Sequence, residues 1–223
     1  MADPLKSDRP VILCALEFES QMLQKEGMEE HYDIVCCGPG ADSICLWAQH
    51  RKSNNAPVIL AGLAGSLTAE CEAGSAHVIT EVVDEPGETH WSPTLKGIAK
   101  PDGNTDIIIT STNASLSGRL ARQLMHHETG GMLIDLESVE FAIAARKFGW
   151  TWGIVRGVSD DLSSLLPEDI DQWVDDTGGT RWGYVMRRLL CRPSLLPVVL
   201  ELRNHSTQAM SNVAELIRLM LPE

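Results

Sequence analysis

The sequence predicts an α/β fold in which a mixed, mainly parallel sheet lies between two layers of helices. Along most of the 223 residues, short apolar segments alternate with longer segments whose apolar residues have helical spacing. Glycine and proline separate these segments, as at Gly27 and Gly38. Strands that alternate with helices form βαβ units with parallel strands. We therefore expect one three-layer αβα domain over 1–223, with a helical tail from about residue 178.

The expected elements are read from apolar periodicity and from turn residues. Strands are expected at 11–16, 32–37, 57–60, 77–83, 107–110, 132–135 and 151–158. Helices are expected at 17–26, 41–50, 117–127, 138–148, 178–190 and 195–221. The strand at 57–60 runs straight into segment 61–65, where tight turns are expected at Gly62 and Gly65, and the Gly-, Pro-, Thr- and Asp-rich segment 87–106 is expected to be mostly loop.

Composition and charge limit the classes of partner. The chain is 43% hydrophobic and 22% charged, which is typical of a globular protein. Its net charge of −13 argues against binding to nucleic acids or anionic membranes, because such a surface repels phosphate groups. No apolar segment is long enough to span a bilayer, and the start lacks a secretory pattern. We therefore expect a cytoplasmic protein.

The six cysteines are expected to be reduced thiols. No CxxC motif and no Cys/His spacing of a metal site occurs, and no signal peptide indicates an oxidising compartment. We therefore expect neither disulfides nor a metal, and nothing in the sequence calls for a cofactor.

The segment LIDLESVEFAIAARKFGWTWGIVRGVSDD, at 133–161, is the most informative. Glu137 opens an apolar helical stretch, and Arg156, Ser159 and Asp160 follow about one strand later. Open α/β sheets bind ligands beyond the carboxyl ends of their strands. We therefore expect these side chains to meet over one ligand.

Five short motifs, in order, resemble the nucleoside phosphorylase and nucleosidase superfamily, whose members cleave N-glycosidic bonds. They are CALEFES at 14–20, CGPGA at 37–41, AGLAGSL at 61–67, DLESVEFA at 135–142 and VRGVSDD at 155–161. Within it, the chain resembles most the hopanoid-associated branch, which removes adenine from adenosylhopane and is related to the 5′-methylthioadenosine/S-adenosylhomocysteine nucleosidases. The direct passage from the first helix to the second strand and the tail at 191–216 carry this finer resemblance.

The resemblance implies roles for two carboxylates. Asp160 would be the general acid toward purine N7, held in orientation by Ser159, and such an acid must keep a proton near neutral pH. Its structural alternative is a helix N-cap. Glu137 would accept hydrogen bonds from the ribose hydroxyls and stabilise an oxocarbenium-like centre, with Leu136 against the sugar. Its alternative is a first-turn glutamate favoured by the helix dipole.

Glu19 and Arg156 bear on whether water or phosphate is the nucleophile. A glutamate can orient and deprotonate water but repels phosphate. The glycine loop around Gly38 and Gly40 carries no basic residue, and Asp42 adds repulsion. Hydrolysis is therefore favoured over phosphorolysis. A surface glutamate and a strand-end arginine are the alternatives.

The substrate is expected to differ from that of the methylthioadenosine enzymes. Leu63 stands where those enzymes carry a serine, next to the small residues Ala64 and Gly65. Ser115, followed by Leu116, stands where they carry an aromatic residue that stacks on adenine. A larger or more apolar 5′ substituent is one hypothesis, and Trp91 is an alternative residue for stacking on the base.

Three functions remain open from the sequence: a purine nucleosidase for a 5′-modified adenosine, a nucleoside phosphorylase, and a catalytically silent nucleoside-binding protein. The resemblance also implies a homodimer or larger homo-oligomer. The helical tail with Trp173, Trp182 and Tyr184 offers contact surfaces for it.

Overall fold

The computed structural model describes most of the chain. It covers residues 9–51, 56–95, 106–113, 115–116, 118–164, 166–167 and 169–221. Much of the expected loop 87–106 and the first residue of the expected helix 117–127 lie outside the described residues.

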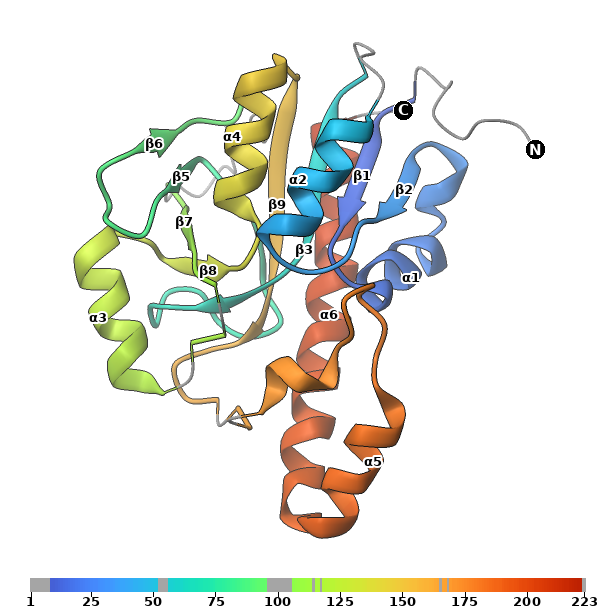
Figure 1. Ribbon diagram of the computed structural model, residues 1–223, viewed down its shortest axis with the longest axis vertical. Helices are drawn as coiled ribbons and strands as arrows, with labels where there is room; N and C mark the ends of the chain where they lie inside the picture. The colour runs from blue at the N-terminus through green and yellow to red at the C-terminus, as the bar shows by residue number, and fades with distance from the viewer. Residues whose placement is uncertain are drawn as a thin grey trace.

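A mixed, mainly parallel sheet forms the centre of the molecule (Figure 1). Its strands are β1 (Val11–Cys14), β2 (Asp33–Cys36), β3 (Val58–Ser66), β4 (Ala76–Val78), β5 (Glu81–Val83), β6 (His90–Trp91), β7 (Ile108–Ser111), β8 (Leu133–Asp135) and β9 (Trp152–Asp160). The order is β2-β1-β3-β8-β7-β5-β6, and β9 pairs with both β3 and β4. The pairs β1–β2, β1–β3, β3–β9, β5–β7 and β7–β8 are parallel, and β3–β8, β4–β9 and β5–β6 are antiparallel. The predicted fold class is confirmed.

Helices cover both faces of this sheet. They are α1 (Glu17–Lys25), α2 (Ala41–His50), α3 (Arg119–Thr129), α4 (Ser138–Phe148), α5 (Trp182–Cys191) and α6 (Leu196–Met220), with short 3₁₀ segments η1 (Met28–Glu30), η2 (Ile170–Trp173) and η3 (Pro193–Leu195). Figure 1 shows α2 and α4 in front of the sheet and α6 behind it. None of the described helices is long and apolar enough to cross a membrane.

The alternation of strand residues produces the two cores between these layers. In β1, Val11 and Leu13 pack with Ile44 of α2 and Phe141 of α4, in one buried cluster. The intervening Ile12 and Cys14 point the other way, into a cluster with α1 and α6. Successive side chains of a strand face opposite sides, so a continuous apolar run such as this one indicates a strand buried on both faces.

Two expected strands have different limits because of their partners. The expected strand 57–60 continues through the small residues to Ser66, and the predicted turn at 61–65 is wrong, because β3 stays paired with β9 as far as Gly65 and Asp160. The expected strand 77–83 is two strands, since β4 pairs with β9 whereas β5 pairs with β7.

The N-cap alternative for Asp160 is also wrong, because β9 runs to Asp160 and no helix follows it directly. Asp161 makes the turn instead, as its Oδ1 accepts the backbone N–H of Ser163 at 2.8 Å.

We expect the substitution Gly157→Ala to destabilise the fold. A Cβ at Gly157, in β9, would lie 2.8 Å from the Cβ of Ala209 and 3.0 Å from its carbonyl carbon, so α6 would be pushed from the sheet. Overpacking of this kind costs about 1–3 kcal/mol of the free energy of unfolding, measurable by urea denaturation.

Gly183→Ala in α5 is the matched control, because a Cβ there meets nothing within 4 Å. Alanine is the better helix former, so this variant should be unchanged or slightly more stable. Equal stabilities of the two variants would contradict the close packing of α6 on β9.

Candidate active site

Polar and charged side chains gather where the parallel strands β1, β2, β3 and β9 end. Glu19 follows β1, the loop with Gly38 and Gly40 follows β2, and Glu137 follows β8, which lies beside the end of β3. Arg156 and Asp160 belong to the last half of β9. This is the edge at which α/β sheets bind ligands.

Arg156 is the centre of a buried charged cluster. Its side chain is fully buried, and its Nη2 contacts Asp135 and lies 3.4 Å from Glu137 Oε2. Burial would lower the pKa of this guanidinium, but Asp135, Glu137 and Glu19 together raise it above its ordinary value. Its Nε and Nη1 have no hydrogen-bond partner within the described part of the chain. The strand-end alternative for Arg156 is therefore wrong.

Glu19 is held by three backbone N–H groups and is not a surface residue. Its exposed fraction is 2%. Oε2 accepts hydrogen bonds from Ala15 N at 3.0 Å and Leu16 N at 2.9 Å, and Oε1 accepts one from Leu63 N at 2.7 Å. Burial raises the pKa of Glu19, and Arg156 and these N–H donors oppose that increase. The carboxylate is thus fixed between the ends of β1 and β3.

The glycine at position 62 lets Glu19 and Arg156 approach each other. A Cβ on Gly62 would lie 2.5 Å from Glu19 Oε1 and 2.6 Å from Arg156 Nη1. Any side chain at this position would displace one of the two charged groups. The buried carboxylate oxygen and the buried, unpartnered guanidinium N–H thus both lie against the backbone of Gly62.

Glu137 points into the same region instead of along its helix. It is the N-cap residue of α4, yet its side chain makes no cap hydrogen bond. Oε1 accepts the backbone N–H of Gly40 at 2.8 Å, and Oε2 faces Arg156. Burial and the nearby Asp135 raise the pKa of Glu137 to about 7, against the opposing effect of Arg156. The helix-dipole alternative does not describe this residue.

Asp135 supports the cluster and was not predicted. It accepts hydrogen bonds from Ser111 Oγ at 2.5 Å, Ser138 Oγ at 2.5 Å and Ser138 N at 3.1 Å, in addition to Arg156. It therefore caps α4 and neutralises the arginine at once. Its place two residues before Glu137, at the end of a strand, was the signal in the sequence.

Asp160 belongs to a second group, farther along β9. Ser159 Oγ donates to Oδ1 at 2.5 Å, as expected, and the buried Arg122 of α3 contacts Oδ2. Ala64 pairs with Val158 but Gly65 with Asp160, so Ser159 is an extra residue, a β-bulge. Bulges re-aim side chains beside active sites.

Arg122 is the residue that sequence reasoning missed most clearly. Besides Asp160, it donates to the carbonyl oxygens of Leu116 at 3.0 Å, Asp161 at 3.1 Å and Ser66 at 3.3 Å. The expected proton donor is therefore held in place by a buried cationic side chain.

A cavity of about 320 Å³ lies beside Glu137. It is lined by Pro39, Gly40, Ala41, Asp42, Thr112, Asn113 and Leu136. Leu136 thus lies where a sugar could pack against it, and the glycine loop forms the opposite wall. Asp42 adds a negative charge to that wall.

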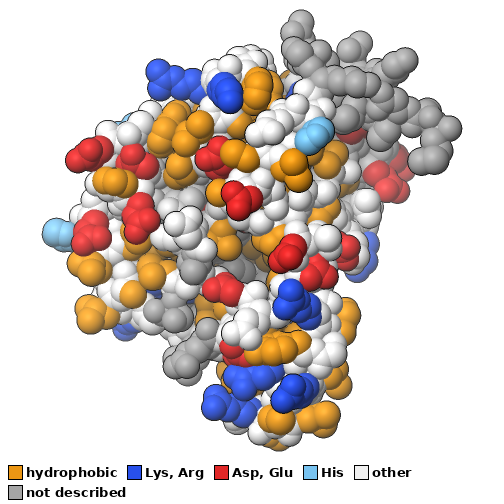
Figure 2. Space-filling model, in the orientation of Figure 1, with side chains coloured by type: hydrophobic (Ala, Val, Ile, Leu, Met, Phe, Trp, Pro, Cys, Tyr) orange, Lys and Arg blue, Asp and Glu red, His pale blue; other side chains and the backbone are white. Residues whose placement is uncertain are grey.

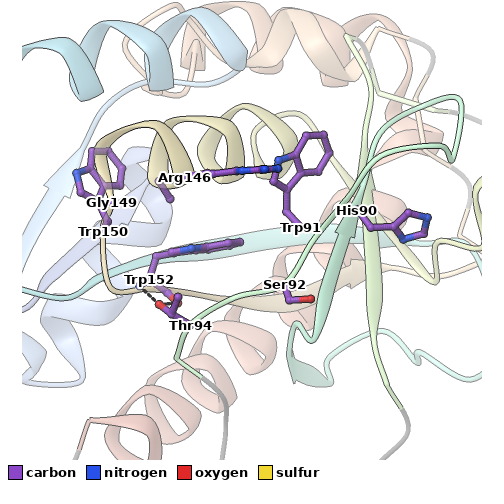
Figure 3. Close-up of a pocket in the computed structure, with 9 residues that line it drawn as sticks. His90, Trp91, Ser92, Thr94, Arg146, Gly149, Trp150 and Trp152 are labelled. Carbon is purple, nitrogen blue, oxygen red and sulfur yellow. Dashed lines mark hydrogen bonds between the residues drawn. The ribbon is translucent and has the colours of Figure 1, made fainter.

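A larger cavity, of about 490 Å³, lies at the other end of α4. Figure 3 shows Trp91 and Arg146 on one side of it, with Trp150 and Trp152 nearby. α4 has 11 residues and is about 16 Å long, which separates this cavity from Glu137. Its lining has no carboxylate, and Trp91 belongs there, not beside the charged cluster.

The expected base-binding residues Ser115 and Leu116 line neither cavity. Ser115 is exposed and bonds through its backbone N and its Oγ to Asp171 of η2. Leu116 packs against a small cluster of Leu67, Met125 and Ile134.

Among the expected oligomer contacts, Trp173 is buried inside the subunit, whereas Trp182 is exposed.

No group of three or more metal-ligating side chains is found among the described residues. The described cysteines are all free thiols.

We expect the stability of the protein to fall as pH rises from about 4.5 to about 7, because of Glu137. Its pKa is about 7 in the folded protein against an ordinary 4.5, so the native state keeps a proton that the unfolded chain has lost. Glu137→Gln removes this effect. Relative to wild type, the free energy of unfolding of the variant should gain about 3 kcal/mol between pH 4.5 and pH 8.

Glu128→Gln, at an exposed position of α3, is the control and should follow wild type at every pH. Urea denaturation across this range measures both. A constant difference between Glu137→Gln and wild type would contradict the raised pKa.

Solved structures with a similar fold include nucleosidases. No family model matches the sequence, and no curated protein matches it. Futalosine hydrolase of Helicobacter pylori superposes with a TM-score of 0.66 and 11% identity, covering 96% of this chain and 97% of that one. The 5′-methylthioadenosine/S-adenosylhomocysteine nucleosidase of the same organism gives 0.67 and 11%, covering 97% and 99%. Its counterpart from Colwellia psychrerythraea, in complex with adenine, gives 0.64 and 16%, covering 97% and 96%.

Proposed function

We propose that this protein hydrolyses the N-glycosidic bond of a purine nucleoside and releases the base. The observation that carries the proposal is the buried cluster of Glu19, Glu137 and Arg156 at the ligand-binding edge of the sheet. Burying three ionisable groups costs several kcal/mol and is typical of a functional site. The likeness in fold to the methylthioadenosine nucleosidases and futalosine hydrolase supports the same assignment.

Glu137 is assigned to the ribose. A carboxylate has about four acceptor sites, and Gly40 N and Arg156 occupy two of those of Glu137. The remaining lone pairs of Glu137 are free to accept hydrogen bonds from sugar hydroxyls. The cavity lined by Leu136 adjoins it. In the ionised form, Glu137 would stabilise the positive charge that develops as the glycosidic bond breaks.

Glu19 and Arg156 are assigned to the attacking water. Glu19 Oε1 and Arg156 Nη1 both lie close to Gly62, 2.5 Å and 2.6 Å from the place that a Cβ there would occupy. A water molecule bound to both would donate to the carboxylate and accept from the guanidinium, which orients a lone pair and provides a base.

Asp160 is assigned to the leaving base. Ser159 and Arg122 fix its orientation. As general acid, Asp160 would donate a proton to the purine as the glycosidic bond breaks.

Phosphorolysis is the second candidate, and the charges argue against it. Glu19, Asp135 and Glu137 outnumber Arg156 in the cluster, and Asp42 lines the adjoining cavity. An incoming phosphate would meet these carboxylates, whereas water would not be repelled.

The proposed substrate is an adenosine with a large or apolar 5′ group, such as an adenosylhopane-like lipid. The sequence resemblance to the hopanoid-associated branch and Leu63 support this choice. The backbone of Leu63 holds Glu19, while its side chain packs against the cluster that contains α6. A homodimer or larger assembly and a cytoplasmic location stay predictions.

We expect base release from 5′-modified adenosines without added phosphate. A chromatographic screen of adenosine, methylthioadenosine, inosine and long-chain adenosyl lipids would measure it, with ribose 1-phosphate assayed in parallel. Phosphate-dependent release with formation of ribose 1-phosphate would establish the phosphorylase instead. Binding of adenosine analogues without any turnover would establish a binding protein.

The variants Asp160→Asn and Glu19→Gln should each lower kcat by about 10²–10⁴, because each removes a proton-transfer group. Glu17→Gln, on the exposed face of the same helix as Glu19, is the matched control and should keep wild-type activity. Full activity in both site variants would show that the catalytic residues are assigned wrongly.

A further inference from the structure

The chain between Arg181 and Arg203 forms a hairpin that projects from the body of the molecule, which we call the basic hairpin. It consists of α5, η3 and the first turns of α6. Figure 1 shows it extending beyond the edge at which β1 and β2 end, so that its tip, near η3, is far from the sheet. The candidate active site opens at this same edge.

The basic hairpin has the opposite charge to the rest of the protein. Between residues 181 and 203 the chain has five arginines and one glutamate, a net charge of +4 in a protein whose total is −13. Arg188 is paired with Asp169, but Arg181, Arg187, Arg192 and Arg203 are exposed. Figure 2 shows Lys and Arg side chains gathered at this end.

An apolar stripe lies beside these arginines. Trp182, Met186 and Leu190 recur every fourth residue of α5 and are 68%, 52% and 78% exposed. Val185, on the other edge of the apolar face, is buried, so the helix needs only that edge for packing. Leu196 and Leu200 extend the exposed apolar surface onto α6.

We propose that the basic hairpin docks on the surface of an anionic lipid bilayer. The exposed arginines of the hairpin and the exposed Trp, Met and Leu side chains of α5 supply the two contributions by which amphipathic segments bind at the headgroup boundary, attraction to anionic lipids and apolar burial. No described helix spans a membrane, so the hairpin lies on the bilayer instead of crossing it.

The acidic body does not prevent this contact. α5 has 10 residues and is about 15 Å long, whereas charges are screened over about 10 Å at 0.1 M salt. When the tip of the hairpin touches the bilayer, the acidic body is farther from the lipid headgroups than this screening length, so their repulsion is weak. The net charge of −13 predicts repulsion from an anionic membrane only if the charge is spread evenly. In this protein the basic segment 181–203 is separate from an acidic body.

A second copy of the chain is a poorer occupant of this surface. A two-fold contact places the same patch on both partners, so two segments that each carry a net charge of +4 would meet. An anionic bilayer satisfies both the arginines and the apolar stripe.

Vesicle flotation of the full-length protein tests the proposal. We expect binding to vesicles of 70% phosphatidylcholine and 30% phosphatidylglycerol at 0.1 M salt. Binding should be at least about tenfold weaker for phosphatidylcholine alone and should fall at 0.5 M salt. The double variant Arg187→Glu/Arg192→Glu should lose at least about tenfold in the partition coefficient, whereas Arg146→Glu/Lys147→Glu, on α4, should keep it.

Leu190→Glu tests the apolar stripe and should weaken binding by a similar factor. Its control is Leu120→Glu on α3, because Leu120 is 80% exposed, like Leu190 at 78%. All positions are exposed, so circular dichroism should show folded variants.

Two outcomes would overturn the proposal. One is the absence of binding to anionic vesicles at 0.1 M salt. The other is equal binding by the hairpin variants and their controls. Should Leu190→Glu instead convert a dimer into a monomer in sedimentation equilibrium, with no vesicle binding by wild type, the surface is a contact between copies.

Discussion

The burial of the Arg156 guanidinium is the constraint on which the rest of the site depends. A fully buried cation is tolerated only if carboxylates surround it, because its desolvation costs several kcal/mol. Asp135, Glu137 and Glu19 meet this need, and they come from two separate parts of the chain. The start of α1 and the segment that joins β8 to α4 thereby meet at Arg156 in β9. Burial in this cluster and the nearby Asp135 raise the pKa of Glu137, and Glu19 lies close to an unpartnered guanidinium N–H.

Much of the fold could be predicted because its signals are local. The helices at Ala41–His50 and Ser138–Phe148 have the predicted limits, since apolar periodicity and flanking glycines define them. The continuation of β3 to Ser66 could not be predicted in this way. Small residues are typical of turns in an isolated segment, and only pairing with β9 keeps them extended. The division of 77–83 into β4 and β5 depends in the same way on distant partners.

The site residues that belong to sequence motifs were predicted. The residues that join the site only through tertiary contacts were not. Glu19, Glu137 and Arg156 were singled out from their motifs, and the structure brings them together. Asp160 was placed on the same ligand, but its nearest charged partner is Arg122, 38 residues earlier. Nothing around Arg122 in the sequence distinguishes it from a surface arginine of an amphipathic helix. Trp91, an alternative residue for base stacking, lies at the distant cavity and packs against the core.

Because several buried residues contact Arg156, the substitutions that this sequence can accept at those positions depend on one another. A change that removes the arginine alone leaves three carboxylates buried without a counter-charge, and loss of Asp135 alone weakens the compensation of a buried cation. Gly62 is tied to the same group, because a side chain there would enter the space between Glu19 and Arg156. These positions lie more than ninety residues apart at the extremes, yet each limits the others. Among descendants of this sequence, we expect them to be retained together or replaced together, and not one at a time.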